Sequence, residues 1–335
     1  GGHMKVNIKT ISEITGYSQA TISNVLNHKK GTNRNTAAEI LRVAKDIGYL
    51  NSTKIENIKL VVYKKSGRVL TETPLIADLI AGIESEGREN GLDTIIYNLE
   101  QGEEQFQTKL NVVLEERNSG VILFATELDW EDLKPFQNLP APLVVVDAWF
   151  KEGDFDTVLM DNTNSVYKMV TYLLENHHRD IGYIDSSVSV RNFYYRKKSF
   201  MDTMNEFNIP IEEKYMVKVE PTMNGAYEDM KKYLEGKPQI PTAYCAANDI
   251  IAFGAMKALR ECGCEIPEDV SVVGFDNMPF CEMTSPPLTT IDFPKKEIGI
   301  TAVRQLMQQC NRPERVSYKV ELLTKLVERG SVRKI

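Results

Sequence analysis

At 335 residues, the chain exceeds the roughly 250–300 residues at which a single hydrophobic core stops growing, so we expect at least two domains. No apolar run approaches the roughly 20 residues of a membrane helix, and the N-terminus lacks the layout of a signal peptide, which predicts a cytoplasmic protein without membrane partners. The net charge of −7 is uneven, because residues 4–57 carry eight basic and four acidic side chains while the remainder is acidic. A basic head on an acidic body is typical of a head that meets a polyanion.

The cysteines and histidines predict neither a disulfide framework nor a metal site, because the sequence has no C-x-x-C pair and no metal-ligand spacing. The sequence also lacks a G-x-G-x-x-G after the first strand, a G-x-x-x-x-G-K-[ST] loop and a nucleophile elbow. We therefore expect no cofactor and no enzymatic activity.

Three short helices are expected in the head, residues 4–50. The T-x-x-E of residues 10–13 is typical of a capping box, and Gly16 ends this first helix. Ser18 caps a second helix, and Asn33 or Thr36 begins a third. Three short helices with a tight glycine turn between the first two predict a helix-turn-helix domain.

The second helix of this head presents a face of short polar or small side chains without Lys, Arg or Glu. In the major groove, Gln and Asn can pair with adenine, and small side chains can pack on the thymine methyl group. The simpler alternative is a small helical cap with a solvated face. The predicted base-reading surface comprises Ser18, Gln19, Ala20, Thr21, Ser23, Asn24 and Asn27, and the predicted phosphate contacts are Lys9, Lys29, Lys30 and Arg34.

The run IKTISEITGYSQATISNVLNHKKGTNRNTAAEILRVAKDIGY resembles the DNA-binding head of the lactose-repressor (LacI/GalR) family of bacterial transcription regulators over its whole length. The S-x-A-T-[VI]-S-x-V-L-N core and the closing G-Y carry the resemblance. It implies a homodimeric, nucleoid-associated regulator of double-stranded operator DNA, more often a repressor than an activator. It also implies that Gln19 and Ala20 lead base reading, whereas Asn24 stands where the family usually carries Arg.

The linker, residues 51–57, departs from the family pattern. The family usually has a longer segment with an A-R-x-L hinge helix, whose Leu wedges into the minor groove and kinks the DNA. Here the segment LNSTKIEN, residues 50–57, leads almost directly into the first strand. Apart from Leu50, its only large apolar residue is Ile55. Residues 51–53 favour a turn, so we expect a short tether and little bending of the operator.

From residue 58 onward, apolar runs such as KLVVYK, GVILFA and LVVVD alternate with amphipathic stretches, and the pattern repeats from DIGYID to SVVGFD. This alternation predicts an α/β fold with buried parallel sheets and helices on both faces. It matches the periplasmic-binding-protein-like body that the resemblance implies, with two doubly wound lobes. The expected lobes are residues 58–160 plus 291–315, and 161–290 plus 316–335.

Open α/β sheets bind ligands at the carboxyl ends of their strands, where LVVVD ends in Asp147, TAYCAAN in Asn248 and SVVGFD in Asp276. Arg196 begins a helix after DIGYID. An Arg donates hydrogen bonds, an Asp accepts them and an Asn does both, which suits vicinal hydroxyls. Each residue also has a simpler interpretation, because a strand-end Asp is more often a helix cap, as expected for Asp249, and a lone Arg is more often a surface ion pair.

The R-x-x-x-F motif at Arg196, A-N-D at Asn248 and V-G-F-D at Asp276 resemble the family's effector contacts, although Ser199 stands where the family usually has Gly. Aromatic side chains near the strand ends would add stacking surfaces for a sugar-like effector. In the first strand–helix loop, YKKSGRVLTET, three basic side chains could favour a phosphorylated ligand or be solvated loop charges. The predicted effector site comprises Asp147, Trp149, Tyr195, Arg196, Asn248, Asp276 and Phe293.

Together these patterns predict a transcription regulator whose operator affinity is controlled by a small ligand between the lobes, and the expected ligand is a sugar or sugar derivative. The alternative is a solute-binding receptor whose body binds a sugar and has no regulatory role. A dimer would match two half-sites, and the apolar stripe of Ile76, Leu79, Ile80 and Ile83 is a candidate for its interface.

Overall fold

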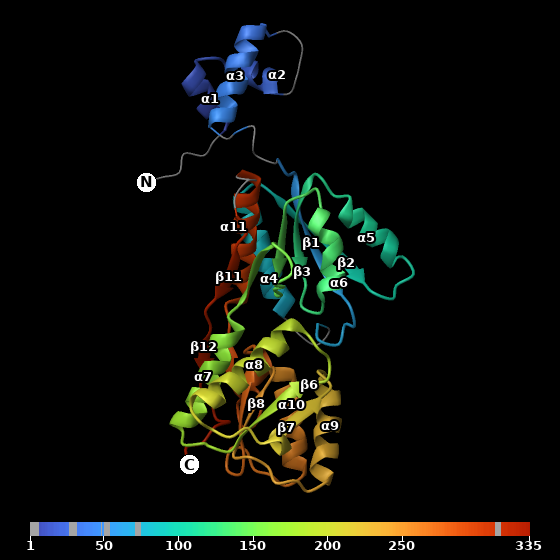
Figure 1. Ribbon diagram of the computed structural model, residues 1–335, viewed down its shortest axis with the longest axis vertical. Helices are drawn as coiled ribbons and strands as arrows, with labels where there is room; N and C mark the ends of the chain where they lie inside the picture. Colours follow the sequence, from blue (N-terminus) through green and yellow to red (C-terminus); the bar gives the residue numbers. More distant parts are fainter. Residues whose placement is uncertain (1–6, 27–31, 48, 50–53, 71–74, 312–315) are drawn as a thin grey trace.

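The computed structural model describes residues 7–26, 32–47, 49, 54–70, 75–311 and 316–335 (Figure 1). The predictions for Asn27, Lys29, Lys30 and the turn at 51–53 lie outside these residues. No helix in the described part of the chain combines the length and the apolar character that crossing a bilayer requires.

The head consists of helices α1 (Ile8–Thr15), α2 (Gln19–Leu26) and α3 (Arg34–Asp46) around a small apolar core of their own, which includes Ile11, Ile22 and Ile40. Gly16 ends α1 in the left-handed region, with φ of 73°, and the Ser18 hydroxyl accepts the Thr21 N–H at 3.2 Å, as predicted. In Figure 1 this head, in dark blue, is a unit distinct from the body.

The predicted capping box at residues 10–13 is wrong. Helix α1 begins at Ile8, three residues earlier than that box requires, which makes Asn7 the N-cap. The Asn7 side chain accepts the Thr10 N–H at 2.9 Å, and the Thr10 hydroxyl faces the Asn7 backbone N–H. Asn is as good an N-cap as Thr, so the capping rule alone did not fix the start of the helix.

The first lobe is a six-stranded sheet in the order β11-β5-β4-β3-β1-β2, in which all paired strands are parallel. Strands β3, β4 and β5 are buried along their whole length, as expected for a sheet covered on both faces. The strands are β1 (Asn57–Lys64), β2 (Asp93–Glu100), β3 (Ser119–Phe124), β4 (Leu143–Val146), β5 (Asp156–Met160) and β11 (Lys319–Leu322). The helices are α4 (Leu75–Glu89), α5 (Phe106–Leu114), α6 (Trp130–Leu133), the 3-10 helix η1 (Lys134–Asn138) and α11 (Lys295–Asn311).

The second lobe is a six-stranded sheet in the order β12-β10-β9-β8-β6-β7, parallel except where β12 pairs with β10. Its strands are β6 (Ile181–Ser186), β7 (Met216–Val219), β8 (Ala243–Ala246), β9 (Ser271–Phe275), β10 (Thr289–Asp292) and β12 (Lys325–Val327). Its helices are α7 (Asn162–Glu175), α8 (Arg191–Glu206), α9 (Met223–Glu235), α10 (Asp249–Glu261) and the 3-10 helices η2 (Glu213–Tyr215) and η3 (Pro279–Glu282). The predicted α/β class with two parallel-dominated sheets is thus confirmed.

The chain passes between the lobes three times: after β5, after β10 and after β11 (Figure 1). The expectation that residues 316–335 all belong to the second lobe is wrong, because β11 pairs with β5 of the first sheet. The backbone bonds from Thr157 N–H to Tyr318 O and from Asp161 N–H to Leu322 O fix that pairing. Only after Leu322 does the chain cross and form β12.

The stripe proposed as a dimer interface lies inside the first lobe, so that prediction is also wrong. Leu79 and Ile83 are buried, and α4 packs closely on α11. A Cβ atom at Gly82 would lie 2.0 Å from the Lys296 carbonyl oxygen, and one at Gly299 would lie 2.3 Å from that of Leu79. Apolar periodicity marks the face that a helix buries, but here a helix more than 200 residues later covers it.

The second half of the expected linker is part of the first lobe. Ile55 is buried in the lobe's core, and the Glu56 N–H donates to the Asn118 carbonyl at 2.7 Å. A side chain held in this way does not serve as a wedge between DNA bases.

Candidate functional site

A cavity between the lobes lies at the carboxyl ends of the strands. Its volume is about 30 Å³, which is enough for a few water molecules. Its walls are Val69, Leu70, Ile76, Phe124, Thr126, Asp147 and Met160 from the first lobe, and Val190, Asn192, Phe193, Arg196, Asn248 and Asp276 from the second. The cavity therefore brings together four of the seven predicted effector residues: Asp147, Arg196, Asn248 and Asp276.

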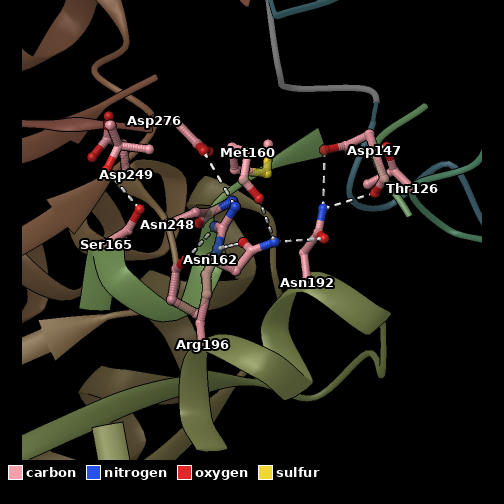
Figure 2. A network of polar contacts seen from close by, with 12 residues as sticks. Thr126, Asp147, Met160, Asn162, Ser165, Asn192, Arg196, Asn248, Asp249 and Asp276 are labelled. Carbon is pink, nitrogen blue, oxygen red and sulfur yellow. Dashed lines mark hydrogen bonds and ion pairs between the residues drawn. The ribbon is translucent and has the colours of Figure 1, made fainter. Parts of the chain in front are cut away.

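Arg196, on α8, is the centre of the polar network in Figure 2. Its Nε donates to Asn162 Oδ1 at 2.8 Å, and its Nη1 donates to the Ala247 carbonyl at 2.7 Å. Its Nη2 lies 3.8 Å from Asp276 Oδ1, and the guanidinium carbon lies 3.5 Å from the centroid of the Phe275 ring. With 3% of its surface exposed, Arg196 is not a surface ion pair.

Asn192 and Asp147 join the two lobes directly. The Asn192 amide donates to the Asp147 backbone carbonyl at 2.9 Å and to its Oδ1 at 3.0 Å, and the Thr126 hydroxyl donates to Oδ2. Asn192 also accepts from Asn162 Nδ2 at 3.0 Å, which continues the network to Arg196 (Figure 2). Asp147 has φ of 66°, in the left-handed region. One chain of hydrogen bonds therefore runs from the first lobe to the guanidinium of the second.

Sequence reasoning missed Asn162 and Asn192. Asn162 ends the run VLMDN, whose position at a strand end was a usable signal. Asn192 lies in the first turn of α8, one helical turn before Arg196, so helical spacing from Arg196 was the only sequence signal for it.

Burial controls the carboxyl groups of the cavity. It raises the pKa of Asp276 to about 7, although the Arg196 charge acts in the opposite direction. Burial also raises the pKa of Asp147, opposed by the Thr126 hydrogen bond, the Arg196 charge and Asn192. The protonated form of Asp276 is thus populated near neutral pH, where the carboxyl can donate as well as accept a hydrogen bond.

Asn248, rather than Asp249, caps α10, which corrects the expectation for Asp249. The Asn248 side chain accepts the Ile251 N–H at 3.0 Å. Asp249 is buried and accepts the Met278 N–H at 2.8 Å and the Thr290 hydroxyl at 2.6 Å. It therefore holds the loop that follows Asp276.

Ser199 connects α8 to α7. Its hydroxyl donates to the Thr163 carbonyl at 2.7 Å, and its side chain is buried. The residue that departs from the family's usual Gly thus fastens the helix that carries Arg196.

The three predicted aromatic contacts do not line the cavity in this arrangement. Trp149 packs against Tyr195, with ring centroids 6.0 Å apart, and Lys319 Nζ lies 4.1 Å from the Trp149 ring. Phe293 is buried behind Phe275, with centroids 6.4 Å apart. Aromatic rings pack on one another wherever they can bury area, so nearness to a strand end did not place them in the site. The aromatic residues that line the cavity are Phe124 and Phe193.

The predicted base-reading face of the head is available to a partner. Ser18, Gln19, Ala20 and Asn24 are exposed, Thr21 and Ser23 are half-buried, and Ile22 and Val25 of the same helix are buried. Among the predicted phosphate contacts, Lys9 is exposed beside Glu13 at 4.0 Å, and Arg34 begins α3. Among the described residues, no group of three or more His, Cys, Asp or Glu side chains is placed to hold a metal ion.

Known proteins with similar sequences and structures agree with this architecture. The model of the periplasmic binding protein-like domain matches residues 170–332. The HTH-type transcriptional repressor PurR of Yersinia pestis (strain Antiqua) is 30% identical over 331 residues, which cover 97% of this chain and 96% of the relative.

Two solved structures share the fold across 98% of this chain and 100% of their own, each with 21% identity. They are a transcriptional regulator CelR–cellobiose complex, with a TM-score of 0.73, and a lac repressor dimer bound to operator and the anti-inducer ONPF, with a TM-score of 0.71. With a relative at 30% identity across nearly the whole of both proteins, this chain belongs to the LacI family of transcriptional regulators.

Proposed function

We propose that this chain is a homodimeric repressor that binds operator DNA through its helix-turn-helix head and is controlled by a small polar ligand bound between its lobes. One observation carries the proposal: a continuous polar network joins both lobes at the cavity, in the same chain as a head whose second helix exposes short polar side chains. A ligand that enters this network must exchange contacts between the lobes, and it therefore favours one arrangement of the lobes over another.

The cavity suits an uncharged, hydroxyl-bearing ligand such as a sugar or sugar derivative. Its walls are mostly apolar, with a few converging polar groups that would fix the orientation of a ligand. Arg196 donates hydrogen bonds, Asp147 accepts them and Asn248 does both, which matches vicinal hydroxyls. CelR, which shares the fold, is in complex with cellobiose. The volume of about 30 Å³ requires the lobes to separate before a ligand of that size enters.

We propose that two copies associate through the β2 edge of the first sheet. Ile95 and Ile96 are 46% and 44% exposed on this strand, which forms the end of its sheet. An exposed apolar edge strand is a surface that a second chain covers well. The lac repressor structure with the same fold is a dimer. Ile96→Asp should produce monomers in sedimentation experiments, whereas Val112→Asp, at an equally exposed position on α5, should not.

The decisive experiment is selection of binding sites from random duplex DNA by the full chain. Two similar half-sites should emerge, as expected for a symmetric dimer acting on DNA in the cytoplasm. A receptor without a regulatory role would enrich no sequence. A thermal-shift screen of sugars, sugar phosphates and nucleobases then identifies the ligand, because a hundredfold excess over the dissociation constant adds about 2.7 kcal/mol.

A further inference from the structure

A buried carboxylate lies at the centre of the loop between β1 and α4. Glu127, just after β3, is 5% exposed. Its Oε2 accepts the backbone N–H groups of residues 65–67 at 3.0, 2.8 and 2.7 Å. Its Oε1 accepts those of Val69 and Leu70 at 2.8 and 3.2 Å. Five backbone donors from one loop therefore converge on a single side chain.

This loop has the geometry of an anion-binding nest. Gly67 has φ of 71°, and a left-handed residue within a turn directs successive N–H groups toward one point. Such a concavity attracts phosphate or carboxylate groups. Burying its N–H groups without an acceptor destabilises the folded protein. Here the occupant is supplied by the chain itself, from the turn after β3, about 60 residues further on.

The same loop forms a wall of the interlobe cavity, because Val69 and Leu70 line it. Thr126, next to Glu127, donates to Asp147 in the network between the lobes. Lys65 Nζ pairs with Asp132 at 2.8 Å and with Asp129. Lys65 is therefore neither a solvated loop charge nor a free cation at the mouth of the cavity.

We propose that Glu127 is a positioning and specificity-determining residue: it fills an anion-binding loop, holds a wall of the ligand cavity in place, and closes this end of the cavity to a phosphate or carboxylate on the ligand. This inference deepens the proposed function, since it rests on the cavity being the ligand site. It assigns the effector to uncharged compounds at this end, rather than to sugar phosphates.

Chemical rescue tests the proposal in the full-length protein without DNA or effector. Glu127→Ala removes the carboxylate and leaves five amides around a space of its size. Its melting temperature should fall, and formate should raise it by about 4 °C more than chloride does at equal ionic strength. Wild type and Glu131→Ala should show no formate-specific rise, because Glu131 is a neighbouring carboxylate with a side chain that is 77% exposed. An equal formate effect in all three proteins would overturn the proposal.

Glu127→Gln provides a second measurement if the alanine variant does not fold. It keeps the volume, but its NH₂ group faces amide donors, so the amides of residues 65–70 should exchange with solvent about tenfold faster than in wild type. Amides of the second-lobe sheet, as the internal reference, should be unchanged. Wild-type protection of the loop in this variant would refute the positioning role. Failure of either test leaves operator selection and ligand screening unaffected, so it is distinguishable from failure of the proposed function.

Discussion

The two functional regions of this protein are organised in opposite ways. The predicted base-reading face of the head lies on and just before one short helix, most of its described side chains are exposed, and Ile22 and Val25 on the opposite side are buried. The polar groups of the interlobe cavity come from segments up to about 150 residues apart, and most of them already bond to one another. We therefore expect the head to recognise DNA with side chains that are already exposed, whereas a ligand in the cavity must replace existing hydrogen bonds between the lobes.

The largest effect is expected in the cavity, from Arg196→Ala. This change leaves the buried Asp276 carboxyl and the Asn162 amide oxygen without their Arg196 partner, which should destabilise the protein by about 3–5 kcal/mol and abolish effector binding. Calorimetry with the identified effector and denaturant unfolding measure the two effects. Lys198→Ala, on the exposed side of the same helix, should change neither. Wild-type effector affinity in the Arg196 variant would place the site elsewhere.

In the head, the effects should be smaller and independent of the cavity. Exchanging Gln19 and Ala20 for other residues should change the selected operator at individual positions, by about 1–3 kcal/mol for each lost base contact, and should leave effector affinity unaltered. Lys9→Ala is the matched control, because loss of a phosphate contact weakens all sequences alike and lowers the salt slope by about one. An unchanged consensus in the Gln19 and Ala20 variants would remove them from base reading.

The pH dependence of stability should also distinguish the cavity from the head. Burial raises the pKa of Asp276 to about 7 in the folded protein, above the value of about 4 in an unfolded chain. Between these values the folded state holds a proton that the unfolded state has lost, so this group makes stability fall as pH rises from about 4 to about 7. Asp276→Asn should flatten the curve of melting temperature against pH in that window. Identical curves for the two proteins would contradict the raised pKa.

The same contrast explains how much the sequence could predict. The helices of the head follow from local signals, such as the Ser18 cap and the left-handed Gly16, and the strands follow from continuous apolar runs. Asp147, Asn248 and Asp276 were found because a rule of α/β sheets places strand ends together. That rule says nothing about which residue bonds to which.

The features that were missed depend on long-range pairing. Asn192 acts through its position opposite Asp147, and Glu127 acts through a loop about 60 residues away. The α4 stripe was assigned to a second subunit because periodicity reveals that a face is covered, but not by what. Strand β11 was assigned to the wrong lobe because a four-residue strand carries no information about its neighbour.

The smallest effect is expected at the linker, which connects the two regions. In the usual arrangement of the family, lobe closure changes the spacing of two hinge helices. Here Ile55 is fixed in the first lobe and cannot act as a wedge, and the sequence lacks the A-R-x-L motif whose Leu would offset the unstacking of DNA bases. We therefore predict that the operator is bent little and that the ligand acts by moving the two heads relative to each other.

Inserting a few Gly-Ser residues after Ser52 should loosen this coupling. The longer tether lowers the effective concentration of the second head at its half-site, at a cost of about 0.6 kcal/mol for each doubling of its length, so DNA binding becomes weaker and less sensitive to the ligand. Effector affinity should not change, because Ile55 and the lobes beyond it are untouched. Operator titrations with and without the effector, on the insertion variant and wild type, measure both quantities. A DNA complex with paired helices over residues 50–57 and a sharp central kink would show instead that the linker acts as a hinge helix, and the ligand would then work by forming or melting it.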